Sequence, residues 1–295
     1  MRAFKFWPTA AASGRAGVPF LCALSAVFLF ACAPPIILAQ EGGPDPSRLT
    51  PLQLEIQKQR RRLNSSETEE RRDAVMRLGW LKRPEGSRAA AAALDDADAI
   101  VRATAARSVL ALPGDEAASL LIPRLQDRDA FVRQETAYAL GETRSRQAVP
   151  GLVALLQSKE KEDGVRGAVA VALGQIGDEA AVIPLAELLG RRVPAKGIIN
   201  RVRRSKKDEN EFVRRAAAHS LGQIRSRAAV PALVAVLGDE RAPDDVRREA
   251  AISLGLIGDA SAAAALRAVS DARDPYLSRA AYEALNKLSP NSTPH

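Results

Sequence analysis

Apolar residues recur along this chain in blocks of about 31 residues, and each block has the pattern of two amphipathic helices. In one block, VRGAVAVALGQIGDEAAVIPLAELL, Val165, Val169, Leu173 and Ile176 stand at helical spacing. A Gly-Asp turn and the leucines of a second helix follow. A unit this small cannot bury its own apolar face, so the pattern predicts stacked units, that is, a solenoid.

Aligning the blocks on a recurrent Val-Arg pair gives spacings of 31, 31, 33, 48, 33 and 31 residues, where the 48 is one unit plus an insertion. The last unit has only a first helix. We therefore expect an all-α, right-handed α-solenoid of about 6.5 helical hairpins over residues 67–288. The units start at Glu70, Val101, Val132, Val165, Val213, Val246 and Leu277.

Two columns of small residues run through these units when the start of each unit is counted as position 0. They predict that neighbouring first helices approach closely. Position 5 is alanine in five units, and position 9 is glycine in five units. The residues are Ala106, Ala137, Ala170, Ala218 and Ala251 at position 5, and Gly79, Gly141, Gly174, Gly222 and Gly255 at position 9.

The repeat array is flanked by segments of different composition. Residues 40–50 are a polar linker rich in glycine and proline. Thr50-Pro51 has the pattern of an N-cap with proline in the first turn, which predicts a capping helix over residues 51–66. Ser66 and Glu69 have capping-box spacing and predict the start of the array. Residues 289–295 are predicted to be a disordered tail.

The consensus VRxxAAxALGxIGDxxAVPxLxxLL resembles the short HEAT-type repeats of the phycobilisome-lyase-like group. The resemblance implies an α-solenoid that binds protein partners. Deoxyhypusine hydroxylase has similar repeats but relies on His-Glu pairs, whereas here His219 is followed by Ser220. The resemblance therefore does not imply that activity.

An arginine recurs at position 1, and in all but one unit an acid or amide precedes it by four residues. Acid and base at this spacing can pair on a helix, and the acid can also act as an N-cap. The row resembles the Asp/Arg ladder that links consecutive units in HEAT families; an anion-binding row is the alternative. The arginines are Arg71, Arg102, Arg133, Arg166, Arg214 and Arg247.

The composition offers little for catalysis. Both cysteines, Cys22 and Cys32, lie in the first 39 residues, and the histidines are His219 and His295. We therefore expect neither a metal site nor a cofactor, and we expect a protein that is not an enzyme.

Residues 1–39 have the pattern of a secretory signal peptide. Arg2, Lys5 and Arg15 precede a long apolar stretch that ends near Ala39. An uncleaved signal anchor and a lipoprotein modified at Cys32 are the alternatives. All three predict an exported protein, periplasmic or extracellular, with a membrane attachment only through the N-terminus.

The insertion at residues 191–207 holds eight basic residues and no acidic one. Residues 40–295 contain 40 basic and 35 acidic residues, so the insertion accounts for the whole basic excess. Such a field attracts anions, but the insertion has no aromatic residue to stack a base, so nucleic acid is not expected. The residues are Arg191, Arg192, Lys196, Arg201, Arg203, Arg204, Lys206 and Lys207.

Together these features predict an extracytoplasmic, non-catalytic scaffold that binds another protein, and an acidic protein is one candidate. Two alternatives stay open. One is an enzyme or enzyme subunit of the lyase or hydroxylase kind, and the other is an adaptor that binds an anionic surface through the insertion.

Overall fold

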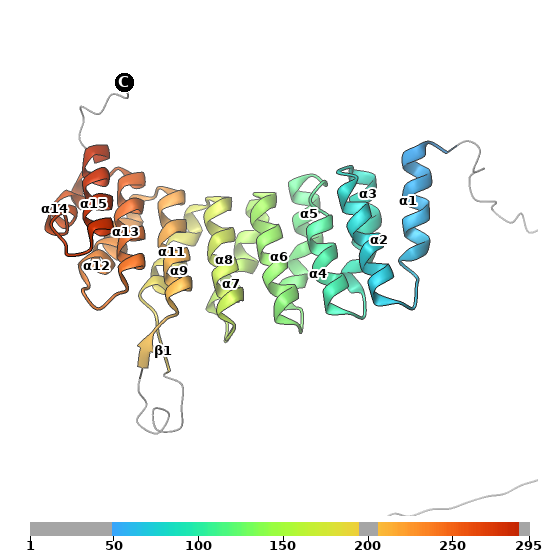
Figure 1. Cartoon of the computed structure of the whole chain (residues 1–295), viewed down its shortest axis with the longest axis horizontal. Coiled ribbons are helices and arrows are strands. Elements are labelled where there is room, and N and C mark those ends of the chain that lie inside the picture. Colours follow the sequence, from blue (N-terminus) through green and yellow to red (C-terminus); the bar gives the residue numbers. More distant parts are fainter. Residues whose placement is uncertain (1–48, 195–205, 289–295) are drawn as a thin grey trace, which may run out of the picture. The chain divides into compact units, whose positions relative to one another are not determined.

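The computed structural model describes residues 49–194 and 206–288, and these residues form a row of helical hairpins (Figure 1). They contain fourteen α-helices and one two-stranded ribbon, and none of these helices is long and apolar enough to span a bilayer. The segments predicted to be a signal peptide, most of the linker and the C-terminal tail lie outside the described residues.

Each unit but the last contributes a first helix and a shorter second helix. A capping helix, α1 (Pro51–Arg62), precedes them. The first helices are α2 (Thr68–Trp80), α4 (Ala99–Ser108), α6 (Ala130–Thr143), α8 (Asp163–Ile176), α11 (Glu211–Ile224), α13 (Asp244–Ile257) and α15 (Pro275–Leu288). The second helices are α3 (Pro84–Ala90), α5 (Gly114–Leu121), α7 (Val149–Gln157), α9 (Val182–Leu189), α12 (Val230–Gly238) and α14 (Ala263–Ala268).

The first helices stand side by side in one layer, with the second helices behind them (Figure 1). The predicted stripe is confirmed in α8, where Val165, Val169 and Leu173 are buried. The acid of the Gly-Asp turn caps the turn that follows it: the Asp178 and Asp259 side chains accept hydrogen bonds from amides two residues further on. Among the described residues, the buried apolar side chains are all aliphatic, and the twelve largest fully buried side chains are all leucines.

The N-terminal end of the array is formed by α1. Thr50 and Gln53 make a reciprocal capping box there, and Ile56 is buried against the core. The capping box predicted at Ser66 and Glu69 is wrong. The N-cap of α2 is Glu67, which makes no side-chain capping bond, while Ser65 accepts the Glu67 amide and donates to Glu70.

The glycines at position 9 are where consecutive first helices touch. A methyl group on Gly222 of α11 would lie 2.7 Å from Cβ of Ser253 in α13, and one on Gly255 would lie 2.9 Å from Cα of Ala284 in α15. In every such pair the facing residue occupies position 7 of the next unit. The five alanines at position 5 are also fully buried, as predicted.

The insertion is not a plain loop between helices, although the sequence predicted helices alone. It leaves and returns through an antiparallel ribbon of β1 (Arg192–Pro194) and β2 (Lys206–Asp208), with Val193 opposite Lys207. The ribbon adds a minor β element to the otherwise all-α fold.

The close contacts at position 9 give a stability prediction. Gly222→Ala should lower the free energy of unfolding by about 1–3 kcal/mol, because the added methyl group overpacks the contact with Ser253. Gly238→Ala is the control. It has no atom within 4 Å of the added methyl group, so it should raise stability by up to about 1 kcal/mol by restricting the unfolded chain. Urea unfolding measures both, and equal effects would contradict close packing of the first helices.

Candidate functional site

The recurrent arginines connect each unit to the next in the N-terminal half of the array. Arg102 forms a two-pronged pair with Asp127, with Nε–Oδ2 2.7 Å and Nη2–Oδ1 2.8 Å, and both side chains are more than nine-tenths buried. Its Nη1 also donates to two carbonyls just before its own helix. Arg71 makes the same two-pronged contact with Asp96 (2.8 Å). Arg133 reaches one oxygen of Glu160 (2.7 Å), and Arg166 reaches one oxygen of Glu209 through Nη2 alone (2.8 Å).

The pairing partner differs from the one expected from spacing. In these four pairs the carboxylate comes from the loop before the next unit, not from the residue four positions earlier. The turn between the second helix and the next first helix brings the carboxylate to the arginine. Helical spacing carries no signal for such a contact. The predicted N-cap role holds for Asp129 and Asn210 but not for Glu67, Asp98 or Glu162.

The ladder changes in the C-terminal half. The Nε groups of Arg214 and Arg247 donate to the carbonyls of Leu189 and Leu237, at the ends of the preceding second helices. Asp274 stands in the N-cap column, where it accepts hydrogen bonds from the Tyr276 and Leu277 amides, and it pairs with Arg248. The departure at Arg247 falls in the one unit whose sequence has no acid or amide four residues before the arginine, because Pro243 stands there.

Three of the ladder acids, Asp96, Asp127 and Glu160, have lowered pKa values. For Asp96 the main cause is the hydrogen bonding from Arg71. For Asp127, burial acts to raise the pKa, but the hydrogen bonds from Arg102 and from the Asp129 amide outweigh it. These acids are charged in the folded protein at neutral pH, so each contributes stability that is lost as the pH falls.

Of the eight basic residues predicted as a binding site, the structure describes only some. Arg192 and Lys206–Lys207 lie in the ribbon strands, and Arg191 precedes β1. Lys196, Arg201, Arg203 and Arg204 lie outside the described residues. The structure therefore locates the base of the basic insertion and leaves its binding role a prediction.

A buried acid anchors that base to the ladder. Glu209, at 1% side-chain exposure, follows β2 and accepts a hydrogen bond from Arg166. Its amide donates to the Arg191 carbonyl at 2.9 Å, and its second carboxylate oxygen lies 3.9 Å from Nε of Arg191. The insertion thus begins after α9 and ends at Glu209, the residue that pairs with Arg166 in the ladder.

The exposed side of the first helices, called here the first-helix face, carries five of the six aromatic residues of 40–295; the sixth, Tyr282, stands at position 5 of the last unit, a column that is buried in the other units. None of them is in the core. Phe212 packs over Gly167 of the preceding first helix, and the Tyr276 ring lies 5.4 Å from the Arg248 guanidinium carbon. The six are Trp80, Phe131, Tyr138, Phe212, Tyr276 and Tyr282, and all but the half-buried Tyr138 are at least 43% exposed.

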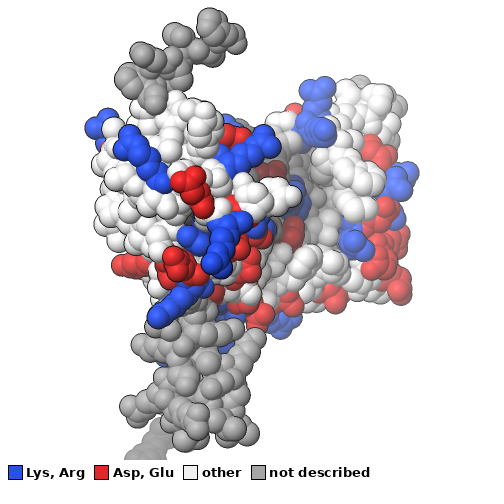
Figure 2. Space-filling model, turned by 60° about the vertical axis from the view of Figure 1, so that its left-hand side comes forward, with Lys and Arg blue, Asp and Glu red and all other residues white. Residues whose placement is uncertain are grey.

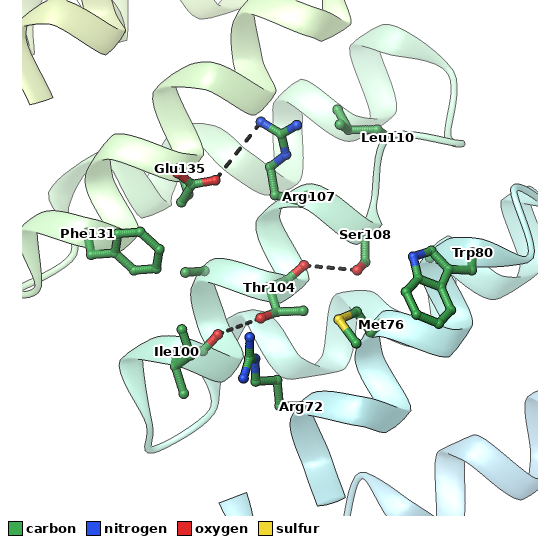
Figure 3. A pocket seen from close by; sticks show the side chains of 12 residues that line it. Arg72, Met76, Trp80, Ile100, Thr104, Arg107, Ser108, Leu110, Phe131 and Glu135 are labelled. Carbon is green, nitrogen blue, oxygen red and sulfur yellow. Dashed lines mark hydrogen bonds and ion pairs between the residues drawn. The ribbon is translucent and has the colours of Figure 1, made fainter. Parts of the chain in front are cut away.

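A hollow of about 410 Å³ opens on this face between α2, α4 and α6, and we call it the α4 hollow (Figure 3). Trp80 and Met76 lie on one side of it and Phe131 on the other, with the small side chains of α4 between them. Its lining is Arg72, Met76, Gly79, Trp80, Ile100, Ala103, Thr104, Arg107, Ser108, Leu110, Phe131 and Glu135.

The hollow has a local cause in the sequence. Position 9 of this unit is Leu110, where the neighbouring units have Gly79 and Gly141. A leucine cannot occupy a helix–helix contact that leaves no room for a methyl group, and α4 ends early, at Ser108. Leu110 lines the hollow instead.

His219 lies on the same face and is about half exposed. Its Nδ1 is 2.8 Å from Oε1 of Glu249 on α13, a partner that sequence spacing did not reveal. Within residues 49–194 and 206–288, no three His, Cys, Asp or Glu side chains are grouped as metal ligands are.

The ladder predicts a pH-dependent mutational effect. Arg102→Met should lower the free energy of unfolding at pH 7 by about 2–3 kcal/mol, because it leaves the charged Asp127 buried without its partner. The loss should shrink as the pH falls from about 5 to 3, since a protonated Asp127 no longer needs the arginine. Urea unfolding across this range is the measurement. Arg107→Met, an exposed arginine on the same helix, is the control and should change stability by less than about 1 kcal/mol. A loss independent of pH would contradict the pairing.

Comparison with known proteins agrees with this architecture. Curated relatives match only over short stretches: a bilin biosynthesis protein, PecE, of Mastigocladus laminosus is 46% identical over 63 residues, and deoxyhypusine hydroxylase of Gallus gallus is 37% identical over 67. These stretches are 21% and 23% of this chain and 23% and 22% of those proteins. The chain thus spans less than a quarter of their length.

Among solved structures, the complex of CpcE and CpcF of phycocyanin lyase from Nostoc sp. PCC7120 is similar, with 25% identity and a TM-score of 0.48. The alignment covers 85% of this chain and 97% of that one. The family model described as HEAT repeats matches residues 58–141, 119–196 and 195–286, which together make up most of the solenoid. The repeated hairpins, the small-residue contacts and this match show that the chain belongs to the HEAT-repeat family.

Proposed function

We propose that this protein is an exported, non-catalytic scaffold that binds a partner protein across its first-helix face. The observation that carries the proposal is the placement of the aromatic residues. All six aromatic side chains of 40–295 are spread along α2, α6, α11 and α15 and are open to solvent, wholly or in part. Aromatic residues are enriched in protein–protein interfaces and supply many of their binding hot spots.

The second helices differ in this respect. Among the large apolar residues of the described chain that are exposed, only Ile183 belongs to a second helix. The exposed positions there are mainly alanine, proline and polar residues, such as Ala154 and Ala235. The apolar area available to a partner therefore lies on the first-helix face.

The charges of the described surface fit a binding role better than a catalytic one. Many arginines on it pair with acids of neighbouring units, as Arg215 does with Asp245, and both signs intermingle in the view of Figure 2. The histidine that could act as an acid or base, His219, is exposed and faces Glu249 alone among the described residues. Export rests on the pattern of residues 1–39.

Photo-cross-linking tests the proposed face. Residues 40–295, which include the compact unit from Pro46 to His295, would carry p-benzoylphenylalanine in place of Tyr138 or Tyr276. We expect both positions to cross-link a partner in the extracytoplasmic fraction of the source cells, because the reactive ring then lies in the interface.

The matched controls place the same group at Ala154 or Ala235, exposed positions on α7 and α12. They should give at most about a tenth of the cross-linked product. Equal or stronger cross-linking from the second helices would refute the proposed face, and a partner found only in the cytoplasmic fraction would refute export.

The basic insertion supports a second candidate function, an adaptor that holds an acidic protein or another anionic surface. Its eight basic residues outweigh the net charge of the rest of 40–295, and Glu209 fixes its base to the ladder. A cluster of like charges on an anchored hairpin attracts an anionic partner over about a Debye length, roughly 8–10 Å at physiological salt.

Replacing Arg201, Arg203, Arg204, Lys206 and Lys207 by Ser should weaken binding of an acidic partner at low salt by tenfold or more, an effect on the order of 1.4 kcal/mol. The loss should narrow at high salt because exposed charges are screened. Isothermal titration calorimetry at low and at high salt measures both effects, with heparin as the polyanion and with the partner that cross-linking identifies.

The control removes five charges elsewhere, from the exposed Arg60, Arg61, Arg146, Arg227 and Arg267. It changes the net charge equally but leaves the insertion intact, so it should retain most of the affinity. Equal weakening by the two variants would assign the effect to net charge and remove the case for the insertion.

A further inference from the structure

Large apolar side chains form the walls of the α4 hollow. The only tryptophan of 40–295, Trp80, forms one wall at 67% exposure, and Phe131 forms the opposite wall at 46% exposure. Met76, Ile100 and Leu110 complete the apolar lining. A volume of about 410 Å³ lies in the range of sites that hold small apolar ligands or side chains.

The polar groups on the floor offer little to a ligand. The Thr104 hydroxyl donates to the Ile100 carbonyl at 2.7 Å, and the Ser108 hydroxyl donates to the Thr104 carbonyl at 2.9 Å (Figure 3). Both donors are therefore used within α4. What the floor presents to an occupant is mainly the methyl groups of Thr104 and Ala103.

The charges at the rim are likewise paired. Nη1 of Arg72 lies 3.2 Å from Oε2 of Glu69, while Arg107 lies 3.0 Å from Glu142 and 4.0 Å from Glu135. The buried Nε of Arg72 has no hydrogen-bond partner among the described residues. A charged occupant would have to displace one of these pairs and lose its own hydration, whereas an uncharged apolar group has neither cost. Complementarity to this lining therefore favours an uncharged guest.

We infer that the α4 hollow is the anchor site of the first-helix face, and that it takes an uncharged apolar side chain, such as leucine, methionine or phenylalanine, from a partner polypeptide. The inference rests on the proposed function, because it names where on that face the partner is held and by what chemistry. Binding there depends on apolar contact and differs in this respect from any binding by the basic insertion.

Random peptides displayed on phage and selected on immobilised residues 40–295 test the inference, with Trp80 as a fluorescent reporter in the hollow wall. Selected peptides should share one uncharged apolar residue. Replacing that residue by Ala should weaken binding by tenfold or more, and replacing it by Glu or Lys should abolish binding. The dissociation constant should change by less than about twofold between low and high salt, since no free charge is engaged.

Two variants of the protein locate the site. Thr104→Phe fills the hollow, and Phe131→Ala removes one wall; each should weaken the selected peptides by tenfold or more and suppress the Trp80 signal. Ala154→Phe, on the far side of the hairpins, is the control and should bind like the parent. Thermal melts establish that the variants are folded. If one of the two hollow variants does not fold, the other is enough to test the site.

Charged consensus residues, strong salt dependence, full affinity of both hollow variants, or no selected peptide at all would overturn the anchor site. Cross-linking from Tyr138 and Tyr276, which are not part of the hollow lining, reports on the first-helix face separately. Failure of the hollow with retained cross-linking would therefore leave the wider face standing.

Discussion

The closeness of the first helices is the constraint on which the rest of this structure depends. Where Gly222 meets Ser253 and Gly255 meets Ala284, the backbones leave no space for a methyl group. Close-packed interiors respond to changes of this size, because neighbouring atoms have nowhere to move. The repeat therefore favours small residues at two positions of most first helices, and leucines from both layers fill the remaining space.

This constraint also decides where the large side chains can be. A core built from alanine, valine and leucine has no room for aromatic rings, so the aromatic residues of the body are at the surface, and they are on first helices. Where one unit replaces its glycine by Leu110, the first helix is shorter and the surface opens into the α4 hollow. The interaction surface and the stacking thus follow from the same column of residues.

Most of the architecture could be predicted from the sequence because each unit repeats the same local pattern. Position 9 and the apolar stripe of α8 are examples, since helical periodicity reports directly on which side of a helix is buried. The ladder shows the limit. Arg102 could be recognised as part of a recurrent row, but its partner Asp127 is 25 residues away, in a loop. Neither that contact nor the pair of His219 with Glu249 follows from spacing along a helix.

The candidate site was harder to predict for a related reason. The α4 hollow arises from a departure from the repeat, and Leu110 was visible in the alignment only as a missing glycine. Phe131, Phe212 and Tyr276 share one column, directly before the start of a unit, but the other three aromatic residues stand in three different columns, so no column contains them all. Their common feature, exposure on one layer of helices, needs three-dimensional information.

Because Glu209 anchors the insertion, the length and charge of the insertion are independent of the register of the helices on either side of it. The ribbon returns the backbone to the Arg191 carbonyl, and Glu209 then completes the ladder whatever the length of the segment between Pro194 and Lys206. Loop entropy grows only slowly with length. This position can therefore accept sequences of other lengths and charges while the helices keep their register, which makes it a natural point for functional divergence and for grafting new binding loops.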